Sequence, residues 1–209
     1  MTMVKFCGLS RPEDIAVANE LLPDMVGFVF ARASRRAVTG VAKKLGRALA
    51  PSIRRVGVFM EVKMPEIAEM VKRGVIDTVQ LHAPCAFEVS EAQISELRRA
   101  TKGAELQIIR AFGVSDTTLL HEAERTSADL VLLDNPRGGS GEAFLEGFAR
   151  PYILSGGLTP ENVAPLLERW RPWGVDVSSG IEVAGQKNRD KMIAFLKAVR
   201  MFDGEGIGR

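Results

Sequence analysis

The sequence predicts an α/β protein in which eight parallel strands close into one (β/α)8 barrel ringed by helices. Short apolar runs alternate with helical patterns eight times, about every 25 residues and without a domain-sized insertion. In addition, no Gly-x-Gly-x-x-Gly motif follows the first run, as it would in a dinucleotide-binding sheet. An open doubly wound sheet is the competing architecture, because alternation alone does not prove closure.

Composition sets the broad class. A chain of 209 residues suits one domain, here 1–209, with a glycine-rich tail at 203–209 that we expect to fray. The net charge of +2 does not favour a nucleic-acid surface, and no apolar run has membrane-spanning length. The N-terminus does not resemble a signal peptide, and Cys7 and Cys85 lie in no Cys/His cluster. We therefore expect a reduced, cytoplasmic protein without a structural metal, in contact with neither nucleic acid nor membrane.

The eight strands are expected where apolar residues run continuously, as in strands that are buried on both faces. These runs are 4–7, 25–30, 55–60, 78–81, 106–112, 130–134, 152–154 and 175–177. Such a strand does not readily hold a charge in its middle, so we look for chemistry at its end. Asp134 stands at such an end, although an Asp before Asn-Pro also commonly caps a turn.

The helices between the strands are expected from start and stop signals. The expected helices are 12–22, 41–49, 65–73, one from Ser90, one from Ser115, a short helix or turn at 142–148, one from Thr159, and 188–199. Ser10 with Glu13, and Ser90 with Gln93, have capping-box spacing. Pro160 suits the first helical position, and Gly74 suits the position after a helix end.

In a closed barrel the carboxyl ends of all strands meet at one face, where the active site lies. The polar residues at these ends are Cys7, Arg35, Arg36, His82, Asp134, Ser155, Asp176, Ser178 and Ser179. Two glycine-containing ends, Gly156-Gly157 and Ser179-Gly180, follow the seventh and eighth strands, the usual phosphate site of this architecture. The glycines alone would equally suit turns with positive φ, but the two loops together favour phosphate binding.

Several of these residues have an ordinary structural alternative. Cys7 is either a small buried hydrophobe or, if nearby cations lower its pKa, a base. His82 is either a rim residue or a substrate contact. The arginines of the second loop are either solvated or hold a carboxylate by a bidentate contact. Cys85 has no comparable setting, and we interpret it as structural.

Taken together, these motifs resemble the phosphoribosylanthranilate isomerase family from Val4 to about Val199. The segments that carry the resemblance are Lys5–Leu9, Gly27–Phe30, Ser34–Val38, Val56–Phe59, Val79–His82, Leu132–Asp134, Gly138–Gly141, Gly156–Val163 and Val175–Glu182. The resemblance implies a TIM barrel and the Amadori rearrangement of N-(5-phosphoribosyl)anthranilate in tryptophan biosynthesis. It also implies no metal and no organic cofactor, and a chain that is a monomer or a homodimer.

The resemblance further implies roles for individual residues. Asp134 would be the general acid that opens the ribose ring, with a raised pKa, and Cys7 the general base that takes the C2′ proton. Arg36 would hold the anthranilate carboxylate. Phosphate would be held by Gly156, Gly157, Ser179 and Gly180, and secondary contacts would come from His82 and Asp176. The departures from the family pattern are Arg35 where Pro is common, Ala83, Glu142 and Asn188.

Three other functions compete. The histidine-pathway isomerase would have an aspartate at the end of the first strand, where this chain has Cys7, although dual specificity stays open. An indole-forming synthase would need a lysine deep in the barrel, and no lysine ends a predicted strand. A non-catalytic phosphate binder on the same barrel would not need both Cys7 and Asp134.

Overall fold

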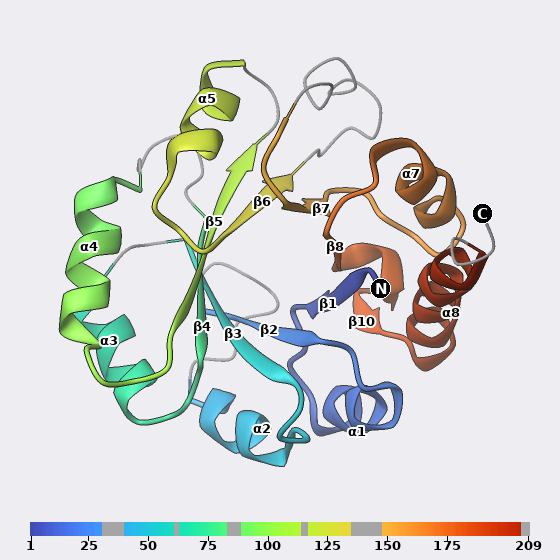
Figure 1. The fold of residues 1–209 in the computed structure, drawn as a ribbon. Coiled ribbons are helices and arrows are strands. Elements are labelled where there is room, and N and C mark those ends of the chain that lie inside the picture. Colours follow the sequence, from blue (N-terminus) through green and yellow to red (C-terminus); the bar gives the residue numbers. More distant parts are fainter. Residues whose placement is uncertain (31–39, 61–62, 83–88, 114–116, 135–147, 206–209) are drawn as a thin grey trace.

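The computed structural model describes residues 1–30, 40–60, 63–82, 89–113, 117–134 and 148–205. Its centre is a closed barrel of eight parallel strands in sequence order, with β8 paired to β1 (Figure 1). The strands are β1 (Met3–Cys7), β2 (Met25–Val29), β3 (Arg54–Phe59), β4 (Thr78–His82), β5 (Gln107–Gly113), β6 (Leu130–Asp134), β7 (Tyr152–Ser155) and β8 (Gly174–Val177). The predicted closed architecture is therefore confirmed, and the open sheet is excluded.

Helices surround the barrel on the outside (Figure 1). They are α1 (Pro12–Leu21), α2 (Ala42–Ala48), α3 (Met64–Lys72), α4 (Glu91–Ala100), α5 (Thr117–Arg125), α7 (Val163–Trp170) and α8 (Arg189–Glu205). A short 3₁₀ helix, η1 (Ser179–Ile181), follows β8 and leads into a small hairpin of β9 (Glu182–Val183) and β10 (Gln186–Lys187), which the sequence did not predict. Most of the expected helix at 142–148 lies outside the described residues.

The two faces of each strand bury different sets of side chains, because successive residues point to opposite sides. In β1, Val4 and Phe6 pack in the layer between strands and helices. Met3 and Cys7 pack in a separate apolar cluster with residues of five other strands, inside the barrel. The intervening residue, Lys5, therefore also faces the interior, and it is fully buried. The barrel interior is thus where a polar side chain has to find a partner.

Three helix starts test the capping predictions. The box at Ser90 and Gln93 is confirmed. The N-cap of the first helix is Arg11 instead of Ser10. The reason is that the Asp14 carboxylate accepts hydrogen bonds from the backbone N–H groups of both Ser10 and Arg11. Thr159 does not cap α7, since Asn162 Oδ1 accepts from the Thr159 N–H in a turn and the helix begins afterwards. Gly74 has the expected positive φ, 63°.

Residues near the two ends of the described chain meet next to the start of β1. Helix α8 continues to Glu205, into the segment expected to fray, and the Asp203 carboxylate accepts hydrogen bonds from the backbone and hydroxyl of Thr2. Within the described ranges, no helix combines the length and the apolar character needed to cross a membrane.

Candidate active site

A cavity of about 460 Å³ opens at the carboxyl ends of the strands. It is lined by Cys7, Val29, Val58, Met60, Gln80, His82, Leu132, Asp134, Ser155, Gly156, Gly157, Leu158, Asp176, Ser178 and Ser179. Nine of the residues that the sequence analysis selected at strand ends thus border one cavity, and a tenth, Gly180, follows directly in the chain. Arg35, Arg36, Cys85 and the segment Gly138–Gly141 lie outside the described residues.

Cys7 ends β1 and is a buried free thiol. Its neighbour on β2 is Gly27, where an added Cβ would lie 3.0 Å from the sulfur, so the glycine leaves the space that the thiol occupies. Burial raises the pKa of Cys7 above its ordinary value. The charges of Lys5 and Lys187 oppose this rise in pKa, and that of Asp176 adds to it.

Lys5 is the residue that the sequence analysis missed. Its ammonium is fully buried and donates a hydrogen bond to Asp176 Oδ1 at 2.8 Å, across the β1–β8 seam where these two residues are paired. Burial alone would lower the pKa of Lys5, but the charges of Asp176 and Cys7 raise it overall. The sequence contained one indication of this position. Met3, Lys5 and Cys7 alternate along one buried strand, so Lys5 lies on the same face as Cys7.

Asp134 ends β6 and is partly exposed to the cavity. Its Oδ2 lies 4.0 Å from His82 Nε2, which comes from the end of β4. Burial raises the pKa of Asp134 and the charge of Asp176 raises it further, while His82 and a hydrogen bond from Ser155 lower it. The direction agrees with the raised pKa expected from the sequence. His82 therefore lies beside the carboxyl group as well as at the cavity wall.

The loops after β7 and β8 touch each other. Gly156 and Gly157 both have positive φ, 94° and 65°. This conformation fits both a simple turn and a phosphate-binding loop, so it does not separate the two interpretations. At Gly180, an added Cβ would lie 1.8 Å from the carbonyl oxygen of Leu158, so no other residue fits there without moving backbone. The close approach brings the backbone of both loops to the same edge of the cavity.

A buried ion pair supports the second of these loops from behind. Lys187 donates hydrogen bonds to Glu182 Oε1 and to the Ser178 carbonyl oxygen, both at 2.8 Å. The Ser178 hydroxyl in turn donates to the carbonyl oxygen of Cys7 at 3.1 Å. The loop after β8 is therefore fixed to the end of β1, which carries the thiol.

Gln80 adds a polar group to the cavity that the sequence analysis did not select. It lies on β4, is 2% exposed, and its Oε1 has no hydrogen-bond partner among the described residues. A buried acceptor without a partner is costly, at about 1–3 kcal/mol. The carboxamide is thus available to a polar group of a molecule that fills the cavity.

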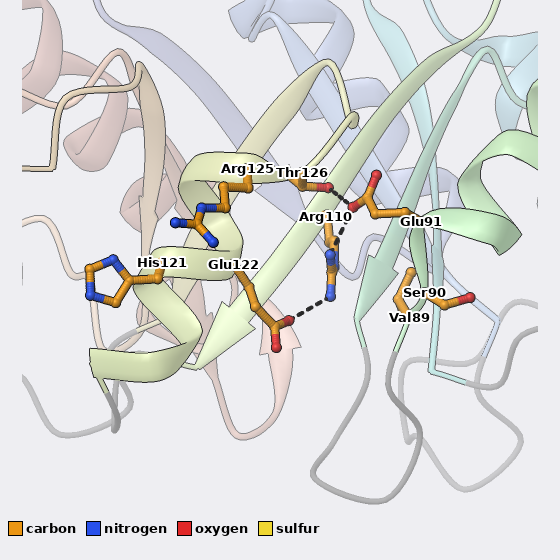
Figure 2. A pocket seen from close by; sticks show the side chains of 8 residues that line it. All are labelled: Val89, Ser90, Glu91, Arg110, His121, Glu122, Arg125 and Thr126. Carbon is orange, nitrogen blue, oxygen red and sulfur yellow. Dashed lines mark hydrogen bonds and ion pairs between the residues drawn. The ribbon is translucent and has the colours of Figure 1, made fainter.

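A second cavity, of about 390 Å³, lies outside the barrel between α4, β5 and α5 (Figure 2). Arg110 reaches into it and is bound by Glu91 at 2.9 Å and Glu122 at 3.0 Å. Burial by itself would raise the pKa of Glu91, but hydrogen bonds from Ser127 and Thr126 and the charge of Arg110 lower it to about 2. Two carboxylates thus hold one guanidinium in this cluster, which joins two helices to a strand.

Comparison with known proteins decides the family. The model of the family described as N-(5'-phosphoribosyl)anthranilate (PRA) isomerase matches residues 4–198, nearly the whole barrel. The chain belongs to the PRA isomerase family. Its reaction is the isomerisation of PRA in tryptophan biosynthesis, and the resemblance seen in the sequence is confirmed.

Individual PRA isomerases match over most or all of their length. The enzyme of Lactiplantibacillus plantarum is 40% identical over 199 residues, which cover 92% of this chain and 89% of the relative. A crystal structure of monomers generated from the dimeric isomerase of Thermotoga maritima is 31% identical, with a TM-score of 0.81, covering 96% and 99% of the two chains. A further isomerase structure, in complex with reduced 1-(o-carboxyphenylamino)-1-deoxyribulose 5-phosphate, is 31% identical, with a TM-score of 0.82 and coverage of 96% and 100%.

Proposed function

We propose that Asp134 and Cys7 are the acid and the base of the PRA isomerase reaction in this chain. The observation that carries the proposal is that a carboxyl group and a thiol, from strands separated by β7 and β8, border one cavity that also holds two glycine-containing loops. The raised pKa of Asp134 supports the first role, since an acid has to keep its proton near neutral pH.

The reaction then proceeds in two proton transfers. Asp134 gives its proton to the ribose ring oxygen while the C1′–O bond breaks, and the nitrogen lone pair forms the protonated Schiff base. The Cys7 thiolate takes the proton from C2′, and the C–H electron pair forms the enolamine and returns the lone pair to nitrogen. The enolamine tautomerises to the ketone, and exchange with solvent restores the proton of Asp134 and removes that of Cys7.

The phosphate and the carboxylate of the substrate would bind on opposite sides of Asp134 and Cys7. Gly156, Gly157, Ser179 and Gly180 would hold the phosphate through backbone N–H groups and a hydroxyl. Arg36 would hold the anthranilate carboxylate, and this assignment rests on the sequence motif alone. The relative bound to a reduced form of the ribulose phosphate product supports this kind of ligand for the cavity. His82 and Asp176 would make secondary contacts.

The pKa directions of the pair predict the pH dependence. The productive form has a protonated Asp134 and a Cys7 thiolate. Because the carboxyl group titrates below the thiol, the population of this form is constant between the two pKa values and falls outside them. The alkaline limb of kcat/KM therefore reports the titration of Cys7, and the acid limb that of Asp134.

Assembly and location are part of the same proposal. One relative is a dimer, which supports a homodimer as one of the two expected states, monomer or homodimer. A cytoplasmic location, a single domain and a reaction without metal or organic cofactor stay predictions.

The test is a fluorescence assay with freshly generated PRA on the wild type, Cys7→Ser and Asp134→Asn. Removing a general acid or base lowers the rate by about 10²- to 10⁴-fold, so both variants should lose kcat by that factor. Cys85→Ser is the matched control for loss of a thiol and should retain activity. A Cys7→Ser variant with the kcat of the wild type would show that another group is the base.

A further inference from the structure

The chemistry proposed for Cys7 requires a thiolate in a part of the barrel where burial favours the neutral thiol. Cys7 is 8% exposed, and the other side chains of its apolar cluster that line the same cavity, such as Val29 and Leu132, offer no hydrogen bond. An anion at this place needs a cation that is fixed, close and itself buried, because solvent does not supply the compensation.

Lys5 meets these conditions by its position on the same strand. Lys5 and Cys7 are two residues apart on β1, so both side chains point to the barrel interior. The Lys5 nitrogen and the Cys7 sulfur lie 3.2 Å and 3.0 Å from one point, the place where a Cβ on Gly27 would stand. The charge of Lys5 also lowers the pKa of Cys7, and that of Cys7 raises the pKa of Lys5. Gly27 thus keeps open the space in which they meet.

Asp176 fixes the ammonium in this place. Its Oδ1 accepts from Lys5 Nζ at 2.8 Å, and strand pairing sets the two residues opposite each other. Both side chains are almost completely buried, at 0% and 6% exposure. A buried ion pair of this kind is not a source of stability in itself, since apolar residues of equal volume often do as well or better. The position of this ion pair beside the thiol suggests an electrostatic role toward Cys7.

We propose that Lys5 is a positioning residue for the Cys7 base, and that its ammonium, held by Asp176, stabilises the Cys7 thiolate inside the barrel. The inference rests on the proposed role of Cys7, which it deepens by naming the group that makes the thiolate accessible. Lys5 itself takes no proton from the substrate.

The other charged groups around Cys7 determine how the loss of Lys5 would affect the thiolate. On the adjoining strands, β2 has no titratable residue and β8 contributes Asp176. Lys187 acts from β10, with Glu182 as its own partner, and Asp134 and His82 lie at the same cavity. Without Lys5, the carboxylate of Asp176 would remain next to the thiol and oppose the thiolate.

The experiment measures the thiol directly, in a Cys85→Ala background in which Cys7 is the single cysteine. The rate of alkylation by iodoacetamide, followed against pH by mass spectrometry, reports the thiolate fraction. Lys5→Met should move the midpoint upward by about one pH unit or more, which slows alkylation at pH 8 about tenfold. Lys5→Arg should keep the midpoint close to that of the parent, because it retains the charge.

A second variant separates charge from folding. Lys5→Met with Asp176→Asn removes both charges, so the barrel interior stays neutral even if the single variant is poorly folded. Its midpoint should lie between those of the parent and Lys5→Met, because the thiol loses an attractive and a repulsive charge together. Circular dichroism and thermal unfolding establish which variants are folded.

Activity of the same variants links the thiol to the reaction. A higher pKa of Cys7 reduces the productive form, so the plateau of kcat/KM in Lys5→Met should fall about tenfold or more and its alkaline limb should move to higher pH. KM should change little.

Two results would overturn different parts of the argument. An alkylation midpoint that Lys5→Met leaves unchanged would overturn the role of Lys5, whatever the activity. A shifted midpoint with an unshifted alkaline limb would overturn Cys7 as the base, while the effect of Lys5 on the thiol would stand.

Discussion

Replacing Gly180 with alanine tests whether the contact between the β7 and β8 loops builds a phosphate site. The added Cβ would lie 1.8 Å from the Leu158 carbonyl oxygen, 2.8 Å from its carbonyl carbon and 3.1 Å from Thr159 Cα. All three neighbours are backbone atoms, so no side-chain rotation relieves the contact. The two loops have to separate by roughly 1 Å, because packed interiors do not tolerate such overlap.

The size of the effect follows from the bonds that the separation would break. Hydrogen bonds to a charged group contribute about 1.5–3 kcal/mol each. Loss of one such bond to the phosphate would raise KM roughly 10- to 150-fold, since 1.4 kcal/mol corresponds to a factor of ten. The inhibition constant for inorganic phosphate should rise with it. The chemistry at the other end of the cavity is untouched, so kcat should fall less than KM rises.

The assay is steady-state fluorescence with PRA, with thermal unfolding of each variant in parallel. Gly113→Ala is the matched control, because its Cβ would have no heavy atom within 4 Å and its φ is not positive. Gly157→Ala separates strain from overlap, since its Cβ would lie in open space but its φ is 65°, which costs about 1–2 kcal/mol. A Gly180→Ala variant with the melting temperature and KM of the wild type would refute the steric reasoning.

Two further predictions concern polar groups elsewhere. The pKa of Glu91 is lowered to about 2, so its carboxylate stabilises the fold above its unfolded pKa and this stability is lost as the pH falls toward 2. Because the side chain is 45% exposed, solvent screening leaves about 1 kcal/mol. Urea unfolding of Glu91→Gln should show this loss at pH 7 and a smaller one at pH 3, and equal losses would contradict it. Gln80→Met should keep the free energy of unfolding or raise it by up to about 1 kcal/mol, because it removes a buried acceptor without a partner among the described residues. It should also raise KM, because the carboxamide is then no longer available to a polar group of the substrate. A loss of more than 1 kcal/mol would show that the amide is already satisfied.

The strands were predictable because most of their residues are apolar and turn residues bound them. The expected strand 130–134 has the bounds of β6, and each of the other seven differs by one residue at one or both ends. The residues at the strand ends were predictable for the same reason, since parallel strands in a closed barrel direct all their carboxyl ends to one side. Convergence of Cys7, His82, Asp134 and Asp176 on one cavity follows from topology and needs no knowledge of side-chain packing.

Helix starts were less predictable because several side chains compete to cap the same backbone. Ser10 has the right chemistry for a cap, but the Asp14 carboxylate accepts from the backbone of both Ser10 and Arg11. Thr159 similarly gives way to Asn162, whose amide oxygen closes a turn before the helix begins. Such outcomes depend on differences of a few tenths of a kcal/mol to about 1 kcal/mol between alternative bonds, which residue type alone does not resolve.

Lys5 shows where reading the sequence locally fails. A charge in the middle of a buried strand contradicts the rule used to select candidates, and its partner Asp176 lies 171 residues away. The rule holds for strands whose two faces are covered by apolar layers, and it fails when one face lines a barrel that closes on itself. Closure brings the first and last strands into register, and that register gives Lys5 its carboxylate. The same register holds the Lys5 ammonium on the face of β1 that also carries Cys7. The residue that looked least compatible with the fold is therefore the one that we propose as the group that stabilises the Cys7 thiolate.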